Sequence, residues 1–129
     1  MAWERQGELH KALLKCVESD EILRLVPSLE DRITISTACH RLGRLGATAC
    51  LGDPRFGELL TRLRRTLPLF GGRQLSNAMH GLGTLSCSIG IAGAALAEML
   101  SLQARRRILE FEPQHLSNTI WACAKMKFK

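Results

Sequence analysis

The stretch RQLSNAMHGLGTL, Arg73 to Leu85, decides the fold because two other stretches repeat its pattern on either side. The upstream copy, TISTACHRLGRL from Thr34 to Leu45, aligns with it when His40 is laid on His80. The downstream copy, QHLSNTIWACAKM from Gln114 to Met126, aligns when Leu116 is laid on Leu75. A period of roughly 40 residues is typical of arrays in which each unit is too small to bury its own apolar face and stacks on its neighbours.

Each copy has apolar residues at positions i, i+3, i+4, i+7 and i+10. This spacing places them on one face of an α-helix and shows no strand-like alternation. The three sets are Ile35, Ala38, Cys39, Leu42, Leu45; Leu75, Ala78, Met79, Leu82, Leu85; and Leu116, Thr119, Ile120, Cys123, Met126. The sequence therefore predicts an all-α fold, an α-solenoid of stacked antiparallel helix pairs with about three repeats of about 40–41 residues.

Helix-boundary signals divide the chain into units. Pro54 and Pro113 are well placed as first helical residues, and Asp31 is a good N-cap for the first repeated helix. From Glu8 to Val26 we expect two short amphipathic runs, and Pro27 stops the second. We expect a single domain, 1–129, with units at about 8–46, 53–86 and 92–127, as part of a longer array.

Between the repeated helices lie the first helices of each pair. The pattern predicts a long helix from about Ala92 to Leu109, with Leu96, Met99, Leu100 and Ile108 pointing inward. Phe70 and Phe111 match under the same shift that lays Leu75 on Leu116, so we expect both to fill the turn between the two helices of a unit.

The composition favours a polyanionic partner. The net charge is +6, and arginine is much commoner than lysine. Arginine binds phosphates through paired hydrogen bonds and stacks on bases. Nucleic acid is therefore the leading partner class, with acidic proteins or membrane surfaces as alternatives. The five cysteines are odd in number and form no CxxC pair, which indicates reduced thiols. No apolar run is long enough for a membrane span, and the N-terminus has neither a secretory core nor a transit-peptide pattern.

Two further stripes recur on the repeated helices. The second stripe, beside the apolar face, is Ser36, His40, Gly43; Ser76, His80, Gly83; and Ser117, Trp121, Ala124. The third stripe, expected opposite the core, is Thr37, Arg41, Arg44; Asn77, Gly81, Thr84; and Asn118, Ala122, Lys125.

The second stripe allows two interpretations. Serine, glycine and alanine let helices approach closely, and the rings could fill the space between units. Alternatively, residues at positions i, i+1 and i+4 are those with which helical-repeat RNA-binding proteins contact a base: polar side chains bond to the base edge, and a flat ring stacks on the base face. On that interpretation the base-reading or stacking residues are Ser76, Asn77, His80, Ser117, Asn118 and Trp121.

Arginines also recur with the period, on the first helix of each pair. They are Arg24, Arg64, Arg65, Arg105 and Arg106. Arginine at regular steps is suited to following a phosphate backbone, and the alternative is a solvated helix face.

The sequence offers little support for catalysis, and we expect no enzyme, metal or cofactor. The four histidines lack the HExxH spacing or a comparable ligand pattern. The stretch Gly81 to Leu85 lies inside a helical pattern and lacks the lysine of a phosphate-binding loop.

The segment FEPQHLSNTIWACAKM, Phe111 to Met126, resembles the octotricopeptide repeats of organellar RNA-binding proteins, which read roughly F-x-P-Q-x-L-A-N-x-x-W-A-x-A-K-L. The central copy departs at the tryptophan. The upstream copy looks more like repeated helices of FAST-kinase and RAP-domain RNA proteins and of the helical-repeat subunits of the RNA-editing substrate-binding complex.

The resemblance covers nearly the whole chain. It implies an α-solenoid that binds single-stranded RNA in mitochondria or chloroplasts, together with other subunits of RNA-processing complexes. The implied roles are transcript stability, processing, editing or translation. A cytoplasmic location and a protein-interaction scaffold of the HEAT or armadillo kind are the alternatives.

Overall fold

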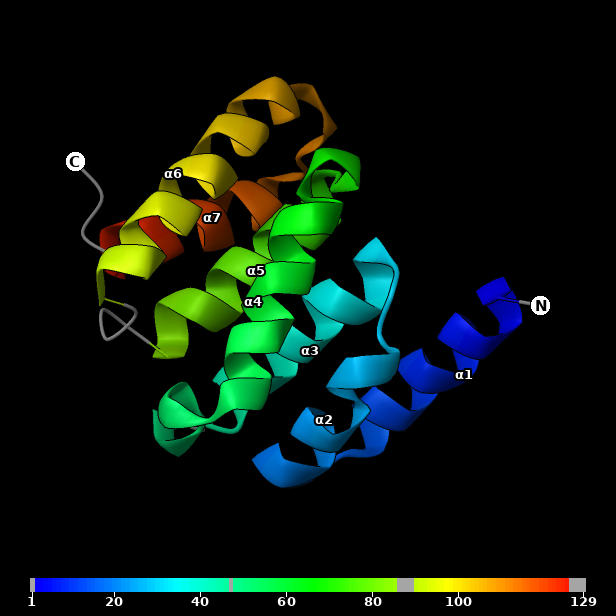
Figure 1. Ribbon diagram of the computed structural model, residues 1–129. Coiled ribbons are helices and arrows are strands. Elements are labelled where there is room, and N and C mark those ends of the chain that lie inside the picture. The colour runs from blue at the N-terminus through cyan, green and yellow to red at the C-terminus, as the bar shows by residue number, and fades with distance from the viewer. Residues whose placement is uncertain (1, 47, 86–89, 126–129) are drawn as a thin grey trace.

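Residues 2–46, 48–85 and 90–125 are described by the computed structural model, and all regular structure within them is helical. The predicted all-α class is confirmed. The α-helices in chain order are α1 (Ala2–Lys15), α2 (Ser19–Leu25), α3 (Arg32–Arg44), α4 (Pro54–Thr66), α5 (Gly72–Leu85), α6 (Gly90–Arg106) and α7 (Pro113–Lys125) (Figure 1).

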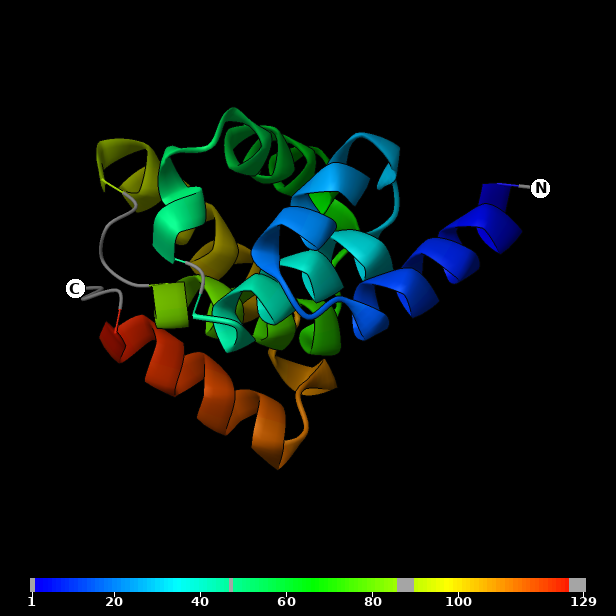
Figure 2. The same ribbon diagram turned by 90° about the horizontal axis from the view of Figure 1, so that it is seen from below.

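The helices form two layers, which Figure 2 shows one above the other. We call α2, α4 and α6 the A layer, and α1, α3, α5 and α7 the B layer. Within the B layer α3 packs against α1 and α5, and α5 packs against α7. Gly72 at the start of α5 lies against Phe111 just before α7, and Gly83 near the end of α5 lies against Ala122 near the end of α7. These two neighbouring helices therefore run in the same direction.

Local signals in the sequence predicted most helix starts correctly. The Asp31 side chain caps α3, because its Oδ1 accepts a hydrogen bond of 2.8 Å from the amide of Thr34. Pro54 and Pro113 are the first residues of α4 and α7. The first run was placed too late, since α1 begins at Ala2 and not at Glu8.

The turns that lead from the A layer to the B layer begin at evenly spaced positions along the chain. Short 3₁₀ turns span Val26–Ser28, Leu67–Leu69 and Ile108–Glu110. Two residues separate Leu29 from the start of α3, whereas one residue separates Phe70 from the start of α5. This extra residue explains why α3 and α5 align at a shift that is one position shorter than the shift between their turns.

A side-chain contact between the A layer and these turns recurs with the same period. Arg62 on α4 donates a 2.8 Å hydrogen bond to the carbonyl of Leu29. At the equivalent positions of the next repeat, Gln103 on α6 donates a 3.2 Å hydrogen bond to the carbonyl of Phe70. Successive helix pairs therefore meet through equivalent contacts at these positions.

The apolar positions are buried in the middle of the molecule and exposed at one end. Ile35 and Leu75 are fully buried, Leu116 is half-buried, and Ile120 is 68% exposed. Met126 lies outside the described residues. The same pattern is more exposed on α7 because no helix of the described chain covers its outer side.

The helix predicted from about Ala92 to Leu109 is α6, which ends at Arg106, and Ile108 lies in the 3₁₀ turn that follows. Its expected inward face is half right: Leu96 and Leu100 are buried, but Met99 and Ile108 are exposed at 39% and 49%. Phe70 is buried as predicted, whereas Phe111 is half-buried beside the open side of α7.

Candidate nucleic-acid interface

Three ring side chains, one from each of α3, α5 and α7, form a row across the B layer. The His40 and His80 rings lie 5.5 Å apart between centroids, tilted by 53°. The rings of His80 and Trp121 lie 4.8 Å apart and are stacked at 28°. We call His40, His80 and Trp121 the ring row. His40 and His80 are half-buried and Trp121 is 39% exposed, so part of each ring faces outward.

The close approach of the helices brings the rings together. A Cβ atom added to Gly43 would lie 2.6 Å from the Cα atom of Gly81, and one added to Gly83 would lie 3.1 Å from the Cα atom of Ala122. Such contacts are possible only where the side chain is absent or very small. The packing interpretation of the second stripe is therefore right for Gly43 and Gly83.

The prediction that the third stripe lies opposite the core is wrong at three positions. Thr37, Gly81 and Ala122 are all buried. Within the B layer α3 and α5 each contact a helix on both sides, and α7 contacts α5, so the buried surface of each helix extends beyond its apolar stripe.

The positions flanking the ring row are polar and share its helical face. On each of the three helices, the residues seven and three positions before the ring and four positions after it lie on the same face as the ring. Positions i, i+4, i+7 and i+11 share one face of a helix. Three residues before the rings are Thr37, Asn77 and Asn118. Four residues after them are Arg44, Thr84 and Lys125.

The three helices that supply the rings carry cations and no carboxylate. The segments that form α3, α5 and α7 contain neither Asp nor Glu, and their charged residues are Arg32, Arg41, Arg44, Arg73 and Lys125. The Lys125 ammonium lies 5.7 Å from the centroid of the Trp121 ring. Arg41 donates a 2.6 Å hydrogen bond to the carbonyl of Cys16, which ties α3 to the end of α1.

Burial and neighbouring positive groups shift the pKa of His40 in the ring row. Burial lowers the pKa of His40 from its ordinary value of 6.5, and His80, Arg44 and Arg41 lower it further. The His40 ring is therefore held in its neutral form more strongly than a free imidazole at neutral pH.

The predicted base-reading residues divide into an accessible and a buried group. Asn77 and Asn118 are half-buried on the face of the ring row, and Ser117 is exposed. Ser76 is 1% exposed, and its hydroxyl has no hydrogen-bond partner among the residues that the structure describes. Ser76 therefore lies between packed helices, where it could not reach a base.

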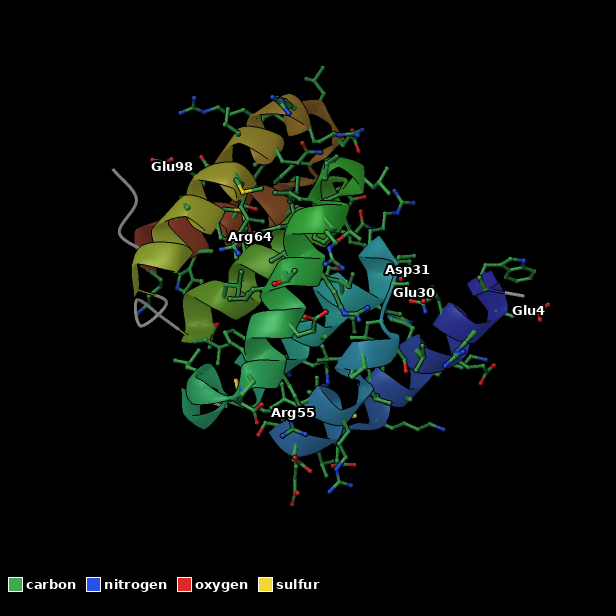
Figure 3. All side chains as sticks on the ribbon, viewed as in Figure 1. Glu4, Glu30, Asp31, Arg55, Arg64 and Glu98 are labelled. Atoms are coloured by element: carbon green, nitrogen blue, oxygen red, sulfur yellow. The ribbon has the colours of Figure 1, made fainter. Side chains whose placement is uncertain are left out.

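The predicted phosphate-binding arginines lie in the A layer, in the last turns of α2, α4 and α6. Arg24 is exposed and forms a 2.8 Å ion pair with Asp20. Arg64 and Arg106 line one groove between α4 and α6, and Figure 3 shows Arg64 on α4. Arg65 and Arg105 each line a different hollow. The set therefore follows the A layer, whereas the ring row belongs to the B layer.

The sequence did not lead us to predict that three cations near the ring row act together. These cations are Arg44, Arg73 and Lys125. A signal for them was present, because the absence of carboxylates from all three repeated segments can be read from the sequence alone.

Comparison with known protein families, characterised proteins and solved structures gives no significant match. Within residues 2–46, 48–85 and 90–125, no group of three or more His, Cys, Asp or Glu side chains could hold a metal ion. No helix in that same part of the chain is long and apolar enough to cross a membrane.

Proposed function

We propose that this chain is a non-enzymatic RNA-binding module, an α-solenoid of stacked helix pairs that binds single-stranded RNA on its B layer. One observation carries the proposal: a ring from each of the neighbouring B helices α3, α5 and α7 lies in a row, and these three helices have five cations and no carboxylate. Stacking on aromatic or imidazole rings and attraction to phosphates are the two interactions by which single strands are held.

The proposal assigns a role to each group on this face. Trp121, at the end of the ring row, stacks on a base. His80, whose ring lies between those of His40 and Trp121, contacts a base edge through its ring nitrogens, and the amides of Asn77 and Asn118 also reach base edges. Arg44, Arg73 and Lys125 bind phosphates beside the ring row, since arginine and lysine donate charge-assisted hydrogen bonds to phosphate oxygens. The A-layer arginines flank the turns into α3, α5 and α7, where they extend the positive field toward the strand.

The solenoid interpretation is supported by the turns and contacts that recur with the period of the sequence repeat. The exposed apolar side of α6 and α7 is the kind of surface that a further unit of a longer array would cover. The resemblance to octotricopeptide repeats supports a role in the metabolism of organellar transcripts in mitochondria or chloroplasts, as part of an RNA-processing complex.

A filter-binding titration against single-stranded RNA at increasing salt tests the proposal. Each phosphate neutralised on a single strand contributes about −0.7 to the slope of log affinity against log salt, so three to five cations predict a slope of roughly −2 to −3.5. An affinity that is independent of salt would count against phosphate contacts.

Trp121→Ala with Trp3→Ala as the control separates stacking from general charge attraction. Losing one base–ring stack costs about 1–3 kcal/mol, or roughly 5- to 150-fold in affinity. Trp3 is 69% exposed on α1 and lies outside the ring row, so its replacement should leave the affinity unchanged. Equal effects of the two variants would contradict the assignment of the ring row.

A protein-interaction scaffold of the HEAT or armadillo kind is the second candidate. It is favoured by an apolar cavity of about 340 Å³ lined by Ile108, Phe111, Leu116 and Ile120. Charge reversal of Arg44 and Lys125 distinguishes the two functions. It should abolish RNA binding, but it should leave unchanged the binding of a protein partner to this apolar cavity.

A further inference from the structure

A separate cavity opens beside the ring row, between the N-terminal halves of α3 and α5 and the middle of α1. Its volume is about 280 Å³, and its lining includes His10, Ile33, Thr37, Arg73 and Asn77. It lies one helical turn from two rings, because Thr37 precedes His40 by three residues and Asn77 precedes His80 by three.

Four of the polar side chains around this cavity have no partner among the residues that the structure describes. In the described part of the chain, no hydrogen bond or ion pair engages the side chains of His10, Thr37, Arg73 or Asn77. Two other lining residues are already occupied: Ser36 donates to the carbonyl of Ile33, and Gln74 accepts from the amide of Gly71. The cavity thus presents a cation, an imidazole, an amide and a hydroxyl with no internal partner.

We infer that this cavity takes a single nucleotide of the bound strand, with its base turned out of the stack and its phosphate on Arg73. The inference rests on the proposed RNA-binding function and names a subsite of it. The Asn77 amide offers one donor group and one acceptor, which is the hydrogen-bonding pattern that base edges require. Ile33, 42% exposed, supplies an apolar wall for the flat face of the base.

The size and charge of the cavity favour this occupant over others. About 280 Å³ is just below the range of about 300–1,000 Å³ that holds drug-sized ligands, so it suits one heterocycle and not an extended peptide. Every ionisable group that lines it is basic, so the cavity suits a ligand with a phosphate. Its place beside the ring row lets neighbouring bases contact the outward edges of His40 and His80 while one base enters the cavity.

Asn77→Asp tests the subsite, and Asn118→Asp is its matched control. Both replacements keep the shape of the side chain and add one negative charge at the same helical position of the same face. Only Asn77 lines the cavity. The probe is a short single-stranded oligoadenylate with one 2-aminopurine, whose fluorescence is quenched in the adenine stack and long-lived when the base is extruded.

We expect a long-lived fluorescence component when the wild-type chain binds this probe. Asn77→Asp should remove that component and weaken binding roughly 5- to 150-fold, since a good two-point contact to a base contributes about 1–3 kcal/mol. Asn118→Asp should also weaken binding, because its amide reaches a base edge, but the bound probe should keep the long-lived component, because Asn118 does not line the cavity. Survival of this component in Asn77→Asp, or its equal loss in both variants, would overturn the inference.

The possible failures are distinguishable. If the probe binds with a salt-dependent affinity and no long-lived component forms, the cavity is not a base subsite and the RNA-binding proposal stands. If the probe does not bind even at low salt, the proposed function fails and the subsite fails with it.

Discussion

Replacing Gly81 by alanine tests the close packing of α3 on α5, on which the ring row depends. A Cβ atom at position 81 would overlap the backbone carbonyl of Cys39 and lie 2.8 Å from the Cα atom of His40. These are backbone atoms of a packed helix, so no rotation of a side chain can relieve the overlap. The two helices must separate for the methyl group to fit.

Two opposing effects determine the size of the change. Alanine is favoured over glycine inside a helix by about 1 kcal/mol. Overpacking a close contact costs about 1–3 kcal/mol, and a backbone overlap belongs at the upper end of that range. We therefore expect Gly81→Ala to lower the free energy of unfolding by about 2 kcal/mol, although helix propensity alone predicts an increase.

Urea denaturation followed by circular dichroism measures this difference, with Gly57→Ala as the control. Gly57 lies within α4, and a Cβ atom added there meets no atom within 4 Å. It should raise the free energy of unfolding by about 0.5–1 kcal/mol. If Gly81→Ala is as stable as Gly57→Ala, the helices are not packed as described and the geometry of the ring row is wrong.

Three other predictions concern buried polar and titratable groups. Gln6→Ala should lower the free energy of unfolding by about 2 kcal/mol, because the Gln6 side chain donates to the carbonyl of Ser28 and accepts from the amides of Glu30 and Asp31; replacement of exposed Gln114 should have little effect in the same denaturation assay. The lowered pKa of His40 means that the unfolded chain binds more protons, so stability present above pH 6.5 should decline as the pH falls below it. His40→Gln should reduce that decline in pH-dependent melting, and an unchanged decline would assign it to other groups. Burial raises the pKa of Cys39 to about 12, so iodoacetamide at mildly alkaline pH should modify it only on unfolding, whereas early modification detected by mass spectrometry would contradict its burial.

The sequence predicted the helices and their period because both depend on local residue patterns. Pro54 and Pro113 fix helix starts through their own backbone geometry, and Asp31 caps α3 through a bond to a residue three positions away. The start of α1 was missed because its buried positions include a glutamine, Gln6, whose partners are 22 to 28 residues away. No local pattern identifies a polar residue that is buried for such partners.

The candidate site was harder to predict, because helical spacing alone does not show which sides of a helix are covered. Ser76 and His80 belong to the same predicted stripe, yet Ser76 is buried and His80 is partly accessible. The stripe could be read from spacing, but the neighbouring helix decides which of its members reach the surface. The separation of the A-layer arginines from the ring row likewise depends on how the two layers of helices pack.

The charge distribution among the helices gives the strongest argument for an external anion. Carboxylates occur on the A helices, at Asp20, Glu21, Glu58 and Glu98, and on α1, at Glu4 and Glu8; Asp20 and Glu58 form ion pairs with nearby arginines. Folding alone does not require their absence from α3, α5 and α7, because exposed ion pairs contribute only about 0–1 kcal/mol and tolerate either sign of charge. A phosphate backbone lying along that row would supply the missing negative charge at the positions where its bases meet the rings.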